Sequence, residues 1–180
     1  MRNAFAVLLA LGIGGFAAGG LAGCGFHPLY GDWGATAGTA DKLQAIYVEP
    51  IPEKLGYELR NNLIDLFDAS GRSSDSVYRL RVTLATKSEG IAIQNDAAIT
   101  RYNDMLTVTY ELTDKATNTV VTKGVETGLS AYNVVTSPYA TLVAQQDADK
   151  RAAEDIAYRI RTDLAVYFAQ ARKAASRRAK

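Results

Sequence analysis

Cysteine and histidine are almost missing from this chain. Its 180 residues include one cysteine, Cys24, and one histidine, His27. An internal disulfide needs two cysteines, and a zinc cluster needs several Cys or His ligands. The sequence has no histidine after residue 27 that could serve as a general base, and it has no Gly-x-Ser-x-Gly nucleophile motif. Metal binding by carboxylates alone, or a hydrolase with a carboxylate or serine site, is the least favoured alternative. We expect no enzymatic activity, no catalytic residue, no metal and no bound cofactor.

A charge excess of either sign is also missing. The chain has 20 basic and 19 acidic residues, and one of the basic residues, Arg2, lies in the amino-terminal leader. Residues 24–180 therefore carry 19 charges of each sign and a formal net charge of zero. Because no overall field favours a polyanion, we expect no nucleic-acid partner.

The first 23 residues are predicted to be a lipoprotein signal peptide. Arg2 supplies a positive start and residues 4–18 an apolar segment, as secretion requires. Glycines within this segment disfavour a permanent membrane span. Leu-Ala-Gly at 21–23 precedes Cys24, which is the pattern of a lipobox. We expect cleavage before Cys24 and lipidation of that residue with N-acyl and S-diacylglycerol groups. A signal cut elsewhere and an uncleaved anchor are the alternatives.

The remaining chain divides into a tether and one domain. Residues 31–41 are small, polar and rich in glycine, so residues 24–41 are predicted to be a lipidated amino terminus and flexible tether. Residues 42–180 are predicted to form a single domain. Its first strand is expected at 43–48. It is expected to end there because Pro50 and Pro52 come next, and a central strand does not accept proline.

Helical and strand patterns alternate within this domain. Leucines spaced by three or four residues predict an amphipathic helix from Pro52 to about Gly71. Period-two alternation predicts strands at 78–84 and 106–112, with a wide connection at 89–98. A turn at 114–118 leads to a third β-rich run at 120–132, in which Gly124 and Gly128 suggest a bulge or a strong bend.

A second helix is predicted to begin at Ser137-Pro138, with serine as N-cap and proline in the first turn. It extends to about Arg172, roughly 50 Å, so we expect its last turns to project from a small sheet. The basic run beyond it could contact anionic head groups or could be a solvated helix end.

Four tyrosines on apolar faces are expected in the core, namely Tyr78, Tyr110, Tyr158 and Tyr167.

These elements predict an α+β fold with the order β-α-β-β-β-α. Two one-faced helices and a one-faced sheet bury their apolar surfaces most simply as a two-layer sandwich. The first connection contains a helix, so the four-stranded sheet is expected to be mixed, with both helices on one face. The other face is expected to be open and polar, presenting Arg79, Arg81, Thr83, Thr107, Thr109 and Glu111.

The chain resembles the LptE family of lipopolysaccharide-assembly lipoproteins. The opening Cys-Gly-Phe-His-Pro-Leu-Tyr-Gly at 24–31 is similar to the start of one branch of that family, apart from His27. The likeness continues in Leu-Arg-Asn at 59–61 and in Ser-Pro-Tyr-Ala at 137–140, which leads into Asp-Ala-Asp-Lys-Arg-Ala-Ala at 147–153. It implies a protein that fills the lumen of the outer-membrane β-barrel LptD as plug and assembly partner and assists lipopolysaccharide insertion into the outer leaflet.

The resemblance also suggests a location and a ligand. Gly25, in place of the aspartate that retains lipoproteins in the inner membrane, agrees with a lipid-anchored place in the outer membrane. Guanidinium groups match phosphate oxygens, so lipopolysaccharide is a candidate ligand. The candidate contacts are Arg79, Arg81, Lys87 and Arg101. These side chains could instead be ordinary exposed residues or pair with barrel carboxylates. The alternative function is a free-standing periplasmic lipoprotein that binds a small amphiphile in a groove between sheet and helices.

Overall fold

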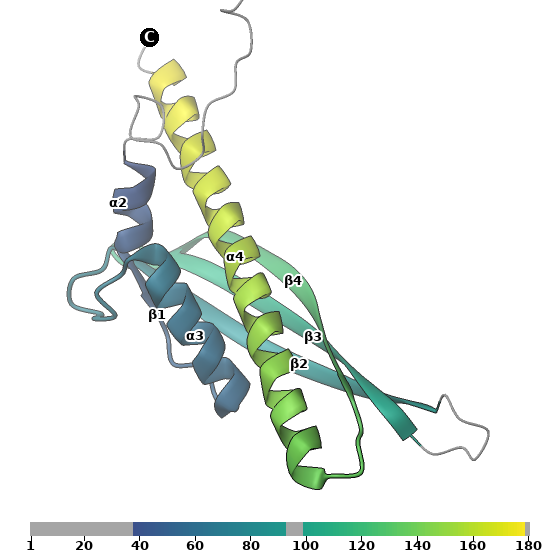
Figure 1. Ribbon diagram of the computed structural model, residues 1–180. Helices are drawn as coiled ribbons and strands as arrows, with labels where there is room; N and C mark the ends of the chain where they lie inside the picture. The colour runs from purple at the N-terminus through teal and green to yellow at the C-terminus, as the bar shows by residue number, and fades with distance from the viewer. Residues whose placement is uncertain (1–37, 93–98, 179–180) are drawn as a thin grey trace, which may run out of the picture.

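The computed structural model describes residues 38–92 and 99–178 (Figure 1). The predicted signal peptide, Cys24 and most of the tether lie outside these residues. Within the described ranges no helix is long and apolar enough to cross a membrane. The elements are α2 (Thr39–Gln44), β1 (Ile46–Val48), α3 (Glu53–Phe67), β2 (Tyr78–Ala92), β3 (Ile99–Asp114), β4 (Thr119–Asn133) and α4 (Pro138–Arg178).

The four strands form one mixed sheet in the order β1-β2-β3-β4. β1 is parallel to β2, with Ile46 opposite Tyr78, and the other two pairs are antiparallel. A parallel pair needs a crossover connection, which α3 provides. Arg60 of α3 donates from Nε to the Val48 carbonyl over 3.2 Å and so joins the crossover helix to β1. The predicted mixed sheet is confirmed.

Both long helices cover the same face of this sheet, which confirms the predicted two-layer α+β architecture (Figure 1). Alternation along each strand points one row of side chains at the helices and the other row away. Full burial of one such side chain contributes about 1.5–3 kcal/mol. The largest fully buried members of the core are Ile46, Leu80, Leu106 and Leu112 from the sheet, Leu59, Leu63 and Phe67 from α3, and Ile156, Ile160 and Leu164 from α4.

The first element of the fold was not predicted. The strand expected at 43–48 begins only at Ile46, and the residues before it form the short helix α2. Thr39 and Leu43, one turn apart, are both buried. A helical turn brings both onto one side, which an extended segment with period two cannot do. The described fold therefore begins at Thr39, within the segment expected to be tether.

The β2–β3 hairpin is longer than its side-chain pattern indicates. β2 continues to Ala92 through part of the predicted connection, with Glu89 opposite Asn103. Backbone pairing with β3 maintains the strand there. Side chains on both faces of this end are exposed, so the strand needs no alternation of apolar and polar residues. Residues 93–98 lie outside the described residues. The turn at 114–118 is confirmed, since Asp114 Oδ1 accepts hydrogen bonds from the backbone N–H groups of Ala116 and Thr117.

The glycines of β4 serve close packing rather than a bulge. The register shift lies at Val121, because Leu112 pairs with Thr122 and Thr113 with Val120. A Cβ atom at Gly124 would lie 2.5 Å from Tyr110 Cζ, and one at Gly128 would lie 2.7 Å from Ile156 Cδ1. Of the two alternatives predicted at the glycines, the bulge is therefore wrong, and the strong bend stays a prediction. Both positions are small because a core side chain approaches them.

The second predicted helix is confirmed and is longer than expected. α4 begins at Pro138, and Ser137 Oγ accepts a hydrogen bond from the Ala140 N–H over 3.4 Å, as an N-cap does. Its 41 residues extend about 60 Å. Phe168 is its last buried residue, and the helix continues past the sheet (Figure 1). Tyr110 is buried as predicted, whereas Tyr158 is 58% exposed on the outer side of α4 and does not belong to the core.

Candidate functional site

The face of the sheet turned away from the helices is a candidate surface, and we call it the open face. Its polar residues lie where they were predicted, at alternate positions of β2 and β3. The face is not uniformly polar, however. Met105, Val125 and Leu129 are 48%, 59% and 57% exposed, and Met105 lies directly opposite Leu129. Threonines at 107, 109 and 127 lie between them. This apolar strip was not predicted, because the run at 120–132 shows no clear alternation that would assign its residues to a face.

Arg79 and Arg81 meet at one carboxylate of the open face. Glu49, just after β1, forms an ion pair through Oε1 with Arg79 Nε over 3.3 Å and accepts a hydrogen bond at Oε2 from Arg81 Nε over 3.0 Å. The hydrogen bond and the charge of Glu49 both raise the pKa of Arg81. Glu111, opposite Arg81 on β3, also acts on Arg81, so two carboxylates face the two guanidinium groups. Glu49 was not predicted, because only the register of β1 against β2 places it between the arginines.

Lys87 and Arg101 lie on the same face, away from this cluster. At about 3.3 Å per residue, Lys87 is roughly 20 Å along β2 from Arg81. Arg101 lies opposite Ile91 near the end of the hairpin, and it donates from Nε to Asn103 Oδ1 over 3.1 Å. The structure therefore brings two of the four candidate lipopolysaccharide contacts together and separates the other two from them.

Polar contacts also join the helix layer to the sheet. The Tyr110 hydroxyl on β3 donates to Asp163 Oδ2 on α4 over 2.9 Å. Glu126 of β4 lies beside this pair, and burial, together with the hydrogen bond and the charge of Asp163, raises the pKa of Glu126. Burial likewise raises the pKa of Tyr110, and the bond to Asp163 adds to the effect. These groups orient α4 on the sheet.

A second polar group is buried nearer the start of α4. Asp104 is 4% exposed and accepts a hydrogen bond from Ser88, its neighbour on β2. Ser130, opposite Asp104 on β4, donates to Asp149 Oδ1 of α4 over 2.6 Å. Burial raises the pKa of Asp149, the charge of Asp104 raises it further, and the bond from Ser130 opposes the rise. Among the described residues, no group of three or more His, Cys, Asp or Glu side chains could hold a metal ion.

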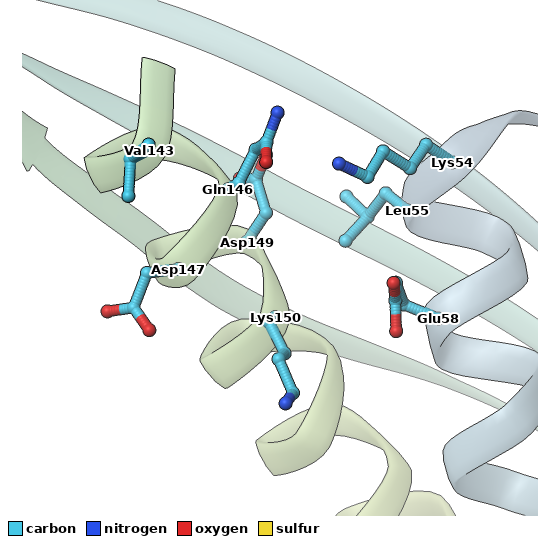
Figure 2. Close-up of a pocket in the computed structure, with 8 residues that line it drawn as sticks. All are labelled: Lys54, Leu55, Glu58, Val143, Gln146, Asp147, Asp149 and Lys150. Carbon is cyan, nitrogen blue, oxygen red and sulfur yellow. The ribbon is translucent and has the colours of Figure 1, made fainter. Parts of the chain in front are cut away.

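A cavity of about 300 Å³ lies between α3 and α4 (Figure 2). Leu55 and Val143 supply its apolar surface, and charged side chains of both signs surround them. Ligand pockets are commonly about 300–1,000 Å³ and mostly apolar, so this one is small and heavily charged. The groove expected between sheet and helices is filled by the core. The lining is Lys54, Leu55, Glu58, Val143, Gln146, Asp147, Asp149 and Lys150.

Another cavity of about 300 Å³ lies where α2 meets the last turns of α4. Gly38, the first described residue, lines it together with Ala171 and Arg172 of α4. Lys42 of α2 reaches over the Tyr78 ring at 5.6 Å from its centroid. The start of the described chain and the projecting end of α4 are thus neighbours.

This architecture, a four-stranded mixed sheet covered by two helices, occurs in structures of bacterial lipoproteins. A candidate lipoprotein from Caulobacter crescentus CB15 aligns with a TM-score of 0.62 and 28% identity, over 76% of this chain and 98% of that one. Rare lipoprotein B from Shewanella oneidensis shares the fold at a TM-score of 0.53 and 11% identity, over 71% and 97% of the two chains. An uncharacterised Rickettsia prowazekii protein is 28% identical over 126 residues, which are 70% of this chain and 78% of that protein.

The family follows from a match to most of the domain. Residues 43–165 match the LptE family, described as lipopolysaccharide-assembly. The matched segment runs from α2 into α4 and includes the whole sheet. The chain belongs to the LptE lipopolysaccharide-assembly family.

Proposed function

We propose that this protein is an outer-membrane lipoprotein that binds the β-barrel LptD as plug and assembly partner and assists lipopolysaccharide insertion into the outer leaflet. The match to the LptE family over residues 43–165 carries the proposal. The role is structural and involves no catalysis. Cys24, with N-acyl and S-diacylglycerol groups, is the proposed anchor.

The open face is the proposed contact with the barrel wall. A large barrel encloses an aqueous lumen, and the strand residues that face the lumen are polar. A plug surface therefore needs polar groups that pair with the wall and some apolar area that packs against it. The open face combines both, since Thr107, Thr109 and Thr127 lie among Met105, Val125 and Leu129. The opposite face is already buried under the helices.

Co-purification tests the partnership. The lipoprotein would be extracted from membranes in mild detergent, and a large β-barrel should accompany it. Val125→Arg with Leu129→Arg should reduce barrel recovery at least tenfold, which corresponds to about 1.4 kcal/mol, because two unpaired cations would face the wall. Tyr158→Arg, at a comparably exposed position on α4, is the matched control and should leave recovery unchanged. A lipoprotein that elutes without any barrel would overturn the proposal.

Depletion tests the assembly role. Loss of the lipoprotein should lower the amount of folded barrel and the amount of lipopolysaccharide at the cell surface. Normal amounts of both after depletion would contradict the role even if the two proteins co-purify. Direct contact of Arg79, Arg81, Lys87 and Arg101 with lipopolysaccharide is a separate part of the proposal. The proximity of Arg79 and Arg81 supports it for that pair, whereas Lys87 and Arg101 would have to contact other parts of the ligand.

The cavity between α3 and α4 favours a second candidate, a free-standing lipoprotein that binds a small amphiphile. Leu55 and Val143 could contact an apolar tail, while Lys54 and Lys150 could pair with an anionic head (Figure 2). The small volume allows only part of such a molecule to be enclosed. Leu55→Trp would fill the cavity. Loss of function in that variant, with barrel recovery unchanged, would favour this candidate over the plug.

A further inference from the structure

The last turns of α4 form a basic arm outside the core. Residues 170–178, which we call the α4 arm, are all exposed. The arm contains four basic residues, Arg172, Lys173, Arg177 and Arg178, and no acidic residue, so its formal charge is +4. The whole chain has a formal net charge of only +1. The arm is therefore a local concentration of positive charge in a nearly neutral protein.

The amino-terminal tether joins the domain beside this arm. Gly38 and Lys42 line the same cavity as Ala171 and Arg172. Figure 1 shows α2 next to α4 and the end of α4 continuing beyond both α2 and the sheet. Gly38 follows Cys24 by only 14 residues. Fourteen residues reach at most about 50 Å, so an anchor on Cys24 would keep the membrane surface within that distance of the end of the domain from which the arm projects.

We propose that the α4 arm binds the anionic phospholipid surface of the membrane that holds the anchor. Lys and Arg side chains close to an anionic leaflet each strengthen binding by about fivefold, and stable attachment commonly combines one lipid with a basic patch. The proposal uses the predicted anchor at Cys24 to place the bilayer. It does not depend on the partnership with LptD.

The arrangement of the cations predicts contact with head groups rather than insertion. Successive helical residues are about 100° apart, so the cations at 172, 173, 177 and 178 leave one free sector of about 120°, which holds only the small side chains of Ala171 and Ala175. Membrane-inserting helices need a stripe of large apolar side chains. Binding should therefore be electrostatic and should weaken as salt increases. A purely structural role, in which cations offset the helix dipole, predicts no dependence on lipid charge.

A probe on the arm tests this in the intact protein. Ala175→Cys introduces the only thiol besides Cys24, which acylation blocks in protein purified from membranes. A fluorophore on that thiol would report energy transfer to head-group-labelled lipid in reconstituted vesicles. We expect strong transfer in phosphatidylcholine mixed with phosphatidylglycerol at low salt, and weak transfer in phosphatidylcholine alone or at high salt.

Two glutamine variants separate the arm from total charge. Replacing the arm cations by glutamine should abolish the phosphatidylglycerol-dependent transfer and leave the far-ultraviolet circular dichroism of the fold unchanged. The control replaces four exposed cations elsewhere, Arg72, Lys123, Arg151 and Arg159, by glutamine, which removes the same charge and should preserve the transfer. Equal transfer in neutral and anionic vesicles, or transfer retained by the arm variant, would overturn the proposal. Transfer that requires lipopolysaccharide and is absent with phosphatidylglycerol would overturn it too.

Discussion

The hydroxyl of Tyr110 donates a hydrogen bond to Asp163 Oδ2 over 2.9 Å, and this bond connects an inner strand of the sheet to α4. Tyr110 is only 4% exposed, so its ring lies within the core while its hydroxyl reaches the polar edge. Gly124 of β4 provides the space beneath the ring. The position of α4 thus depends on a strand residue that has no side chain.

Gly124→Ala should destabilise the fold by about 1–3 kcal/mol, as overpacking of a core typically does. The added Cβ would lie 2.5 Å from Tyr110 Cζ, and the bond to Asp163 hinders the ring from moving away. Denaturant unfolding measures the effect. Val125→Ala, next in sequence but exposed, is the control and should change stability by less than about 0.5 kcal/mol. In a Tyr110→Leu background the cost should fall, and an unchanged cost would show that the ring is not its cause.

Glu126 should make stability depend on pH in the direction opposite to an ordinary salt-bridged carboxylate. Its pKa is raised in the fold, so protonated Glu126 is favoured there. The contribution of protonated Glu126 to the free energy of unfolding is fully present below the pKa of the unfolded state, about 4.3. It is lost as pH rises through the higher pKa of the folded state. Glu126→Gln should therefore stabilise the protein at neutral pH and lose that advantage in acid. Unfolding curves across this range test it, and an advantage that grows in acid would contradict the assignment.

Cys24→Ala should move the protein out of the outer-membrane fraction and leave the domain folded. The described fold begins at Thr39, so the lipid is not needed to complete the core. Cell fractionation measures location, and protease resistance of the 39–178 region measures folding. Cys24→Ser should behave in the same way, because a hydroxyl does not replace the thiol. Loss of the protected domain in either variant would show that anchoring and folding are coupled.

Glu49→Gln distinguishes ligand binding from internal pairing at Arg79 and Arg81. Exposed ion pairs contribute about 0–1 kcal/mol, so stability should change little. Removing the shared carboxylate leaves both guanidinium groups available to phosphate oxygens. If these arginines bind lipopolysaccharide, the variant should bind it more tightly, and Arg79→Ala with Arg81→Ala should bind it less. Asp75→Asn, which removes the carboxylate partner of Arg72, is the control. Unchanged binding in all variants would remove the arginines from the site.

Features encoded by neighbouring residues could be predicted from the sequence. The start of α4 follows from Ser137-Pro138, and the turn at 114–118 follows from the capping ability of Asp114. The alternation at 106–112 assigned the buried face of β3 correctly. In each case the hydrogen bond or the periodicity involves residues a few positions apart, so no tertiary information is needed.

Features that depend on distant partners could not be predicted. Gly124 is small because of Tyr110 and Gly128 because of Ile156, and neither reason is visible within β4 itself. Tyr158 is a different case, because it lies two residues from both Ile156 and Ile160, about 200° around the helix from each, so the helical period alone places it outside the apolar stripe. Glu49 becomes part of the candidate site only through the register of β1 with β2. The sequence indicates that these strands exist, but it does not indicate which residues pair across them, and these contacts depend on that pairing.

The shortness of β1 has a consequence for solubility. Its three residues pair only with 78–80, and within the described parts of the chain no strand continues this edge of β2. The Leu80 carbonyl faces this edge, because it accepts a hydrogen bond from the Glu49 N–H. Backbone N–H and C=O groups face the same edge at alternate residues farther along β2, where another polypeptide could pair with them. Exposed edges of this kind promote aggregation, and charged residues, lysine above all, oppose it. Lys87 and Glu89 occupy this stretch, so they protect the free protein from edge-to-edge association whatever ligand Lys87 binds.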